Sequence, residues 1–149
     1  MEVIHKILVP VDFSEPAQRA LDEAVGLAKA FGAELHLLHC YPLQLSAIDP
    51  YGITPPASYE RQLREAAEQR LSEWCEKSRA QNLIVEQHVT PRSPFTEISA
   101  LAEKLRADLI VMGTRGLGGF KHVLLGSVAE RTIRTAPCPV LTVKQVAAD

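Results

Sequence analysis

Five short apolar segments alternate with amphipathic stretches along this chain of 149 residues, and this alternation constrains the fold more than any other feature. The apolar segments occupy residues 6–11, 34–40, 84–89, 109–112 and 140–143. Short, almost wholly apolar segments are typical of strands that are buried on both faces, as in parallel sheets with helical crossovers. The alternation therefore predicts an α/β fold, a doubly wound parallel sheet with helices on both faces.

The stretches between these segments carry helix signals. Ser14 precedes apolar residues at helical spacing and Gly32 follows them, so we expect these two residues to cap the first helix. A second helix is predicted over 59–75, with Leu71 and Trp74 on its buried face. Ser93 then resembles an N-cap followed by proline in the first helical position. A last helix is expected over 127–135.

Composition excludes several classes of protein. The formal net charge of -2 provides no basic field, so nucleic acid is not expected as a partner. The three cysteines are widely spaced and form no CxxC pair, which favours a reducing compartment over a disulfide framework or a zinc site. The apolar run at 7–11 is too short for a signal peptide, and no stretch approaches the roughly 18 apolar residues of a membrane helix. We therefore expect a cytoplasmic protein with no membrane contact.

A glycine-rich loop after the fourth predicted strand is the main candidate for chemistry. In open parallel sheets, ligands bind at the carboxyl ends of the strands, near the point where the strand order reverses. Asp12 follows the first strand there, and residues 113–116 follow the fourth. The loop ends at Gly126-Ser127, where the last helix begins, and a helix N-terminus favours an anion. These features predict a phosphate site built from residues 113–116 and 126–128.

Two common phosphate motifs do not fit this loop. The P-loop pattern fails because Gly119-Phe120 stand where Lys-Ser/Thr is required after Gly113 and Gly118. The dinucleotide pattern GxGxxG would follow the first strand, but the sequence there is PVDFSEP. Neither a P-loop NTPase nor a nicotinamide-dependent dehydrogenase is therefore expected.

The pattern that does fit is Gly-x2-Gly-x9-Gly-Ser at Gly113, Gly116, Gly126 and Ser127. It resembles the ATP-binding signature of the universal stress protein family, and the segments KILVPVDFSEPAQRAL, ADLIVMGTRG and GSVAERTIRTAPCPVLTV resemble the same family. The resemblance implies one domain over 1–149, Rossmann-like and similar to the adenine nucleotide alpha hydrolases. It also implies a five-stranded parallel sheet ordered 3-2-1-4-5. A homodimer formed through the last strand is implied as well, with Val140, Leu141, Thr142 and Val143 at the interface.

The resemblance also implies roles for single residues. Pro10 and Asp12 would flank the nucleoside, Asp12 would help to hold a phosphate-bound Mg²⁺, and the backbone of Cys40 would meet adenine. The phosphates would lie in a cradle formed by Gly113, Thr114, Arg115, Gly116, Gly118, Gly119, Gly126, Ser127 and Val128. Two positions depart from the family pattern: Cys40 stands where valine is common, and Arg92 stands where glycine is common before the third helix.

Each of these roles has a simpler alternative. Ser127 and Glu130 have the spacing of a capping box, which can coexist with phosphate binding. Asp12 is also a suitable turn residue ahead of Ser14, and the glycines alone would give a flexible loop. The cations Arg115, Lys121 and His122 are equally consistent with a solvated basic loop. The five histidines show no metal-ligand spacing, and His36 and His39 are expected to serve packing.

The sequence thus predicts an ATP-binding, homodimeric sensor or regulator of a stress response, with at most weak ATP hydrolysis. A slow ATPase or phosphotransferase and a nucleotide-free dimeric interaction protein are the alternatives. The sequence does not distinguish ATP from other adenine nucleotides or a dimer from a tetramer. Nor does it identify the stress, the downstream partner or the organism.

Overall fold

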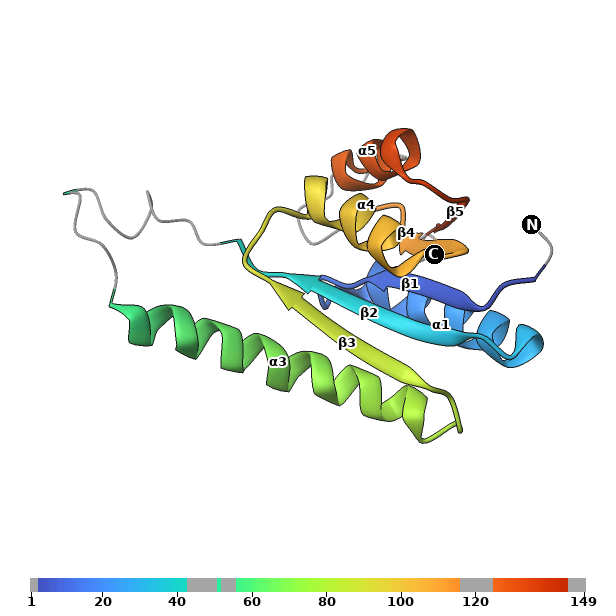
Figure 1. Cartoon of the computed structure of the whole chain (residues 1–149), viewed down its shortest axis with the longest axis horizontal. Helices are drawn as coiled ribbons and strands as arrows, with labels where there is room; N and C mark the ends of the chain where they lie inside the picture. Colours follow the sequence, from blue (N-terminus) through green and yellow to red (C-terminus); the bar gives the residue numbers. More distant parts are fainter. Residues whose placement is uncertain (1–2, 43–50, 52–55, 116–124, 145–149) are drawn as a thin grey trace, which may run out of the picture.

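The computed structural model of the chain describes residues 3–42, 51, 56–115 and 125–144. Five parallel strands form one sheet in the order β3-β2-β1-β4-β5, as predicted (Figure 1). The strands are β1 (Lys6–Pro10), β2 (Glu34–Cys40), β3 (Val85–Thr90), β4 (Leu109–Gly113) and β5 (Val140–Val143). The chain first winds outward from β1 to β3 and then crosses back to β4 and β5. The strand order therefore reverses between β1 and β4.

The helices are α1 (Glu15–Phe31), α3 (Ala57–Arg79), α4 (Pro94–Leu105) and α5 (Ser127–Thr135). Ser14 caps α1 because its side chain accepts a hydrogen bond from the Ala17 N–H, and Gly32 ends the helix in the left-handed conformation. Ser93 caps α4, with Pro94 in its first turn. The predicted starts of α1 and α4 and the predicted end of α1 are thus confirmed.

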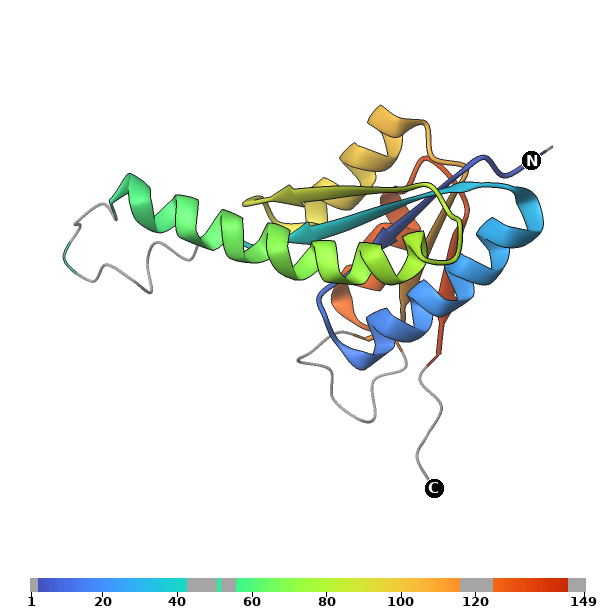
Figure 2. The same cartoon turned by 90° about the horizontal axis from the view of Figure 1, so that it is seen from below.

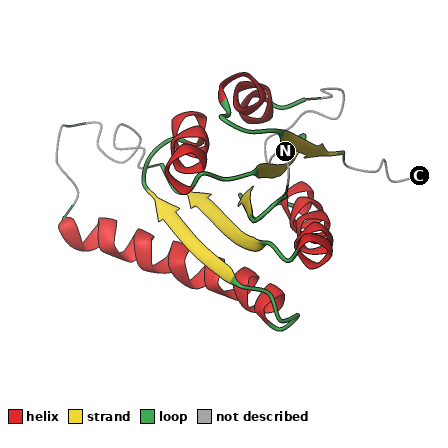
Figure 3. Ribbon diagram, turned by 45° about the vertical axis from the view of Figure 1, so that its right-hand side comes forward, coloured by secondary structure: helices red, strands yellow, loops and turns green. Residues whose placement is uncertain are grey.

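Helices cover both faces of the sheet, which accounts for the nearly continuous apolar strands (Figures 2 and 3). One apolar cluster joins α1 and the inner part of α3 to alternate strand residues such as Ile7 and Leu35. A second cluster joins α4 and α5 to the intervening strand residues, among them Leu8 and Ile110. Because alternate residues of a strand point to opposite faces, one apolar strand contributes to both clusters.

Helix α3 is packed along only part of its length. Its buried residues are Ala67, Leu71, Cys75 and Ser78, while the half that begins at Ala57 extends past the sheet (Figure 1). Trp74 packs against the first apolar cluster, as predicted. The prediction of one buried face from Tyr59 onward is wrong ahead of Ala67: Tyr59 and Leu63 are only half-buried and Ala66 is exposed. A helical period in the sequence does not reveal where the sheet beneath the helix ends.

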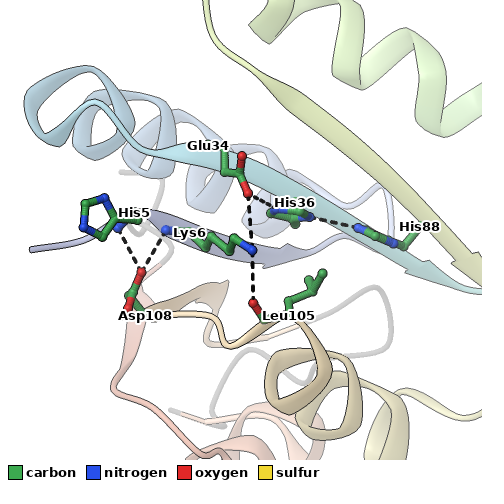
Figure 4. Close-up of polar contacts among 7 residues, drawn as sticks. All are labelled: His5, Lys6, Glu34, His36, His88, Leu105 and Asp108. Atoms are coloured by element: carbon green, nitrogen blue, oxygen red, sulfur yellow. Dashed lines mark hydrogen bonds and ion pairs between the residues drawn. The ribbon is translucent and has the colours of Figure 1, made fainter.

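A chain of polar contacts crosses the sheet on the face that α4 covers (Figure 4). The side chain of His36 contacts Glu34 through Nε2 and His88 through Nδ1, both at 3.0 Å. Lys6 pairs with Glu34 at 3.8 Å and donates to the backbone carbonyl of Leu105. His36 therefore takes part in a hydrogen-bonded chain, although packing alone had been predicted for it.

Candidate functional site

The turn after β1 is ordered around Asp12. The backbone N–H and the hydroxyl of Ser14 both donate to Oδ1 of Asp12, the first across 3.0 Å. Ser14 in turn accepts the Ala17 N–H and so begins α1. Asp12 therefore performs the turn role that the sequence allowed. Its predicted role toward a nucleotide is compatible with this one, since a carboxylate accepts several donors.

Phe13 packs beside this turn in an unusual backbone conformation. Its φ of 63° lies in the left-handed region, which is unfavourable for a residue with a Cβ. The ring lies 4.3 Å from the ring of His39 and 5.4 Å from that of Trp74, and the guanidinium of Arg70 lies 4.3 Å from its centroid. Sequence reasoning did not identify Phe13 or Arg70. No local pattern links them, because the contact joins the turn after β1 to a helix that begins more than 40 residues later.

His39 links the end of β2 to the same turn. Its Nδ1 lies 2.9 Å from the backbone oxygen of Val11, and since a carbonyl only accepts, Nδ1 carries the proton. Burial of the ring lowers the pKa of His39 below its ordinary value of 6.5, although the bond to Val11 opposes this effect. His39 is therefore neutral near pH 7, with a fixed tautomer.

Cys40 is the last residue of β2, at the same edge of the sheet as Asp12. Its side chain is half-buried against the second apolar cluster. Burial, with a contribution from the charge of Glu97, raises the pKa of the thiol to about 12. The thiol is therefore protonated at neutral pH and behaves as a small apolar group. If Cys40 contacts a ligand through its backbone, the exchange of valine for cysteine changes little.

The turn after β4 lies against the beginning of α5. The Gly126 N–H donates to the carbonyl oxygen of Thr114, and the Thr114 N–H donates to Val143 across 3.2 Å. A Cβ placed on Gly126 would lie 3.2 Å from that same carbonyl oxygen, tighter than ordinary contact. A Cβ placed on Gly113 would lie 2.9 Å from the Cβ of Pro16, at the start of α1. The two glycines thus permit close approach between segments of the protein, whereas the motif predicted that they let backbone N–H groups approach a ligand; that role stays a prediction.

The N-terminus of α5 differs from the capping-box alternative. Gly126 is the N-cap, no side chain among the described residues caps the helix, and Ser127 is its first residue. Glu130 does not reach back to the cap; its carboxylate lies 3.7 Å from Arg134. The capping box is therefore wrong: the helix begins one residue earlier than the pattern requires, which leaves Ser127 exposed. The N–H groups of the first turn and the exposed hydroxyl can together receive an anion.

The ladder between β1 and β4 stops before these strands end. Register pairs join Ile7 to Leu109 and Leu8 to Ile110, although β4 continues to Gly113. Pro10 has no N–H to donate, so β1 cannot extend the ladder normally at that position. The ends of β1 and β4 are therefore less constrained by each other at the point where the strand order reverses, which is where ligands bind in open α/β sheets.

The structure brings together part of the predicted site. Pro10, Asp12, Cys40 and Gly113 lie at the carboxyl ends of three adjacent strands, β2, β1 and β4. Thr114 and Arg115 continue from β4, and hydrogen bonding brings Gly126, Ser127 and Val128 to them. The predictions for Gly116, Gly118, Gly119, Lys121 and His122 lie outside the described residues. Arg92, at the predicted rim, is exposed, and its N–H donates to the Thr90 hydroxyl.

Metal-ligand clusters and membrane-spanning helices are both absent from the described part of the chain. Nowhere in it do three or more His, Cys, Asp or Glu side chains gather so that they could hold a metal ion. Nor does it contain a helix that is both long enough and apolar enough to cross a membrane.

Comparison with known proteins identifies relatives over nearly the whole chain. The model of the Universal stress protein family matches residues 4–144. Universal stress protein MJ0531 of Methanocaldococcus jannaschii is 36% identical over 144 residues, which cover 94% of this chain and 82% of that protein.

Solved structures show the same architecture. Hypothetical protein MJ0577 superposes with a TM-score of 0.83 and 29% identity, covering 98% of this chain and 99% of that one. A universal stress protein in complex with cAMP superposes with a TM-score of 0.63 and 27% identity, covering 95% of this chain and 98% of that one. The universal stress protein from Archaeoglobus fulgidus in complex with dAMP superposes with a TM-score of 0.65 and 26% identity, and the coverage is again 95% of this chain and 98% of that one.

Proposed function

The chain belongs to the universal stress protein family, and we propose that it binds ATP at the carboxyl edge of its sheet and acts as a homodimeric regulator. Two structures similar to it hold cAMP and dAMP, so relatives support an adenine nucleotide as the class of ligand. The choice of ATP and the regulatory role go beyond those relatives and rest on the glycine pattern.

We assign the base and ribose to the ends of β1 and β2, with Pro10 and Asp12 beside the nucleoside and the Cys40 backbone beside adenine. The phosphates are assigned to residues 113–119 and to Gly126, Ser127 and Val128. The observation that carries this assignment is the hydrogen bond from Gly126 to Thr114, which sets the N-terminus of α5 beside the turn after β4. Backbone N–H groups and the partial positive charge of a helix N-terminus are what a phosphate requires.

The residues also fit a magnesium ion that accompanies ATP. Mg²⁺ in nucleotide sites is commonly held by one or two carboxylates together with phosphate oxygens and water. Asp12 is a carboxylate at this edge, and we assign it to a ribose hydroxyl or to Mg²⁺, because a carboxylate directly against a phosphate would be repelled. When bound, the ion would neutralise part of the phosphate charge.

The dimer is part of the proposal. Strand β5 lies at the edge of the sheet and pairs with β4 alone among the described strands, so its outer backbone groups are available to a second strand. Leu141 is exposed on this strand, whereas Val140 packs against the second apolar cluster. We propose that two copies pair through residues 140–143. Nucleotide binding at residues 113–115, which pair with β5 through Gly113 and Val143, can then influence that interface.

Substitutions at Ser127 test the phosphate site. Ser127→Asp adds a negative charge at the first position of α5, where the helix dipole stabilises the folded helix and where the charge would repel a phosphate. We expect ATP to bind at least about fivefold more weakly, since like charges within a few ångströms cost on the order of 1 kcal/mol or more even when partly solvated. Ser127→Asn is the matched control, because asparagine has the size of aspartate but no charge. Adenosine is the matched ligand, because it lacks the phosphates.

The measurements are titration calorimetry with ATP, with and without Mg²⁺, and mass spectrometry of nucleotides released from the purified protein. The proposal is supported if Ser127→Asp weakens ATP but not adenosine and Ser127→Asn weakens neither. Equal affinity of all three proteins for ATP would show that the phosphates do not bind at the N-terminus of α5. A wild-type protein that carries no nucleotide and ignores added ATP would favour a nucleotide-free interaction protein.

A further inference from the structure

Phe13 directly follows Asp12 and has a left-handed backbone, with φ of 63°. Such a conformation persists in a residue with a side chain only where the surroundings impose it. Here the surroundings are three side chains from β2 and α3, namely His39, Arg70 and Trp74. We call these three residues and Phe13 the Phe13 cluster.

Two kinds of contact hold the ring of Phe13. His39 and Trp74 pack against it at tilted and edge-on angles, 44° and 74° between ring planes, which are favourable arrangements for aromatic pairs. The guanidinium of Arg70 lies 4.3 Å from the ring centroid, within the range of a cation–π interaction. Arg70 is itself exposed. The guanidinium therefore contacts the Phe13 ring at the surface of the protein and takes no part in the packing of the buried face of α3.

The residues that flank Asp12 are held as well. The Val11 N–H donates to Leu38 across 2.8 Å, and the Val11 carbonyl accepts from His39. On the other side, Ser14 donates twice to the Asp12 carboxylate. The Phe13 cluster therefore restrains the one residue between Asp12 and Ser14 whose backbone is otherwise unfavourable.

We propose that Arg70 is a positioning residue for the nucleotide site: through the ring of Phe13 it holds the turn that presents the Asp12 carboxylate to the ribose. The inference rests on the proposed function. It extends that function by linking ligand affinity to α3, a helix that contributes none of the predicted ligand contacts. Under this proposal, a displacement of α3 would disturb Asp12 through the contacts of Arg70 and Trp74 with Phe13.

The first test measures binding of AMP, which has both ribose hydroxyls and one phosphate to keep affinity measurable. Arg70→Met keeps the length of the side chain and removes the cation; we expect AMP to bind about fivefold more weakly, the size of a surface cation–π contact. Arg70→Lys restores most of the affinity. Arg61→Met, an exposed arginine two and a half turns earlier on α3, is the matched control and should not change it.

The second test asks whether Arg70 acts through Asp12. In an Asp12→Asn background, Arg70→Met should cost little or nothing further, because the group being positioned is gone. If Arg70→Met weakens AMP equally in both backgrounds, or in neither, the positioning role is wrong.

A third measurement needs no ligand and separates this inference from the proposed function. The Ser14 N–H, which donates to Asp12, should exchange with solvent about fivefold faster in Arg70→Met, again the size of the lost cation–π contact, while the Leu8 N–H in β1 is unchanged. Faster exchange at both sites would mean general loosening and would overturn the positioning role, as would no change at Ser14. If the wild-type protein binds neither AMP nor ATP, the proposed function fails, and the exchange rate of the Ser14 N–H alone tests the role of Arg70.

Discussion

The Nδ1 atom of His36 on β2 lies 3.0 Å from the Nε2 atom of His88 on β3, and the two rings are stacked at 22°. Nε2 of His36 lies 3.0 Å from a carboxylate oxygen of Glu34, which can only accept a hydrogen bond. With both rings neutral, His36 therefore donates to Glu34 and accepts from His88. The hydrogen-bonded chain is complete in this state.

This arrangement predicts that acidification destabilises the protein. Burial, with the neighbouring charge of His36, lowers the pKa of His88 below its ordinary value of 6.5. Between the lowered pKa and 6.5 the unfolded chain binds more protons than the folded protein, so stability is lost as pH falls through this window. Burial lowers the pKa of His39 as well, and its contribution has the same sign. Urea unfolding at a series of pH values from 8 to 5 measures the effect.

His88→Gln is the matched variant, because its amide still donates to Nδ1 of His36 but does not titrate. Its stability should depend less on pH than that of the wild type, with a residual slope from His39. A variant whose unfolding curve shifts with pH as much as the wild type's would show that His88 is not the group responsible.

The cysteines are expected to react slowly in the folded protein. Burial raises the pKa of Cys40 to about 12 and that of Cys75 to about 11, and it also raises that of Cys138. Because the thiolate is the nucleophile, alkylation by iodoacetamide at pH 8 should be at least about tenfold slower than in the urea-unfolded chain. Mass spectrometry over time gives both rates. Rapid modification of the folded protein would contradict the burial of these side chains.

Two glycine-to-alanine changes should have opposite effects on stability. Gly113→Ala places a Cβ 2.9 Å from the Cβ of Pro16, so we expect a loss of about 1–3 kcal/mol from overpacking. Gly26 lies inside α1 with nothing within 4 Å of an added Cβ, so Gly26→Ala should stabilise by about 0.5–1 kcal/mol. The denaturant midpoints of both variants, compared with that of the wild type, measure these changes. An unchanged stability of Gly113→Ala would mean that residue 113 and α1 can move apart at little cost.

The proposed dimer should be sensitive to charge at Leu141, which is 41% exposed on β5. Leu141→Lys would place a cation between the paired strands, and we expect the mass in solution to fall from dimer to monomer in light scattering. Phe31→Lys, at the end of α1, changes a residue of similar exposure (47%) and should leave the mass unchanged. Leu141 is preferred to Val140 for this test, because Val140 packs against the second apolar cluster. A charge at Val140 could unfold the protein, and unfolding would be hard to distinguish from dissociation of the dimer. An unaltered mass in Leu141→Lys would place the interface elsewhere.

Most of the fold could be predicted because its signals are local. Apolar runs marked the five strands to within a residue or two at each end, and Ser14, Gly32 and Ser93 marked helix ends where the structure has them. The strand order followed from family resemblance, since periodicity does not record which strands are neighbours. The extent of α3 beyond the sheet was missed because burial depends on what lies beneath a helix.

The candidate site was predictable in part. The spacing of Gly113, Gly126 and Ser127 located two backbone segments that a hydrogen bond joins in the structure. The predicted bounds of α5, 127–135, are confirmed, but the capping box is wrong, because Gly126 and not Ser127 is the N-cap. The contact between Phe13 and Arg70 was beyond prediction, as it depends on tertiary packing of residues far apart in the sequence.

The close approach of Gly113 to Pro16 limits how this sequence can change over generations. A side chain at 113 collides with the Cβ and the backbone carbonyl group of residue 16, in the first turn of α1. Exchanging the proline would not make room, because the atoms in the way are its Cβ and its backbone carbonyl carbon and oxygen, and almost every other residue has the same three atoms. Lineages that descend from this sequence should therefore keep the glycine at 113 even where the proline at 16 has been replaced.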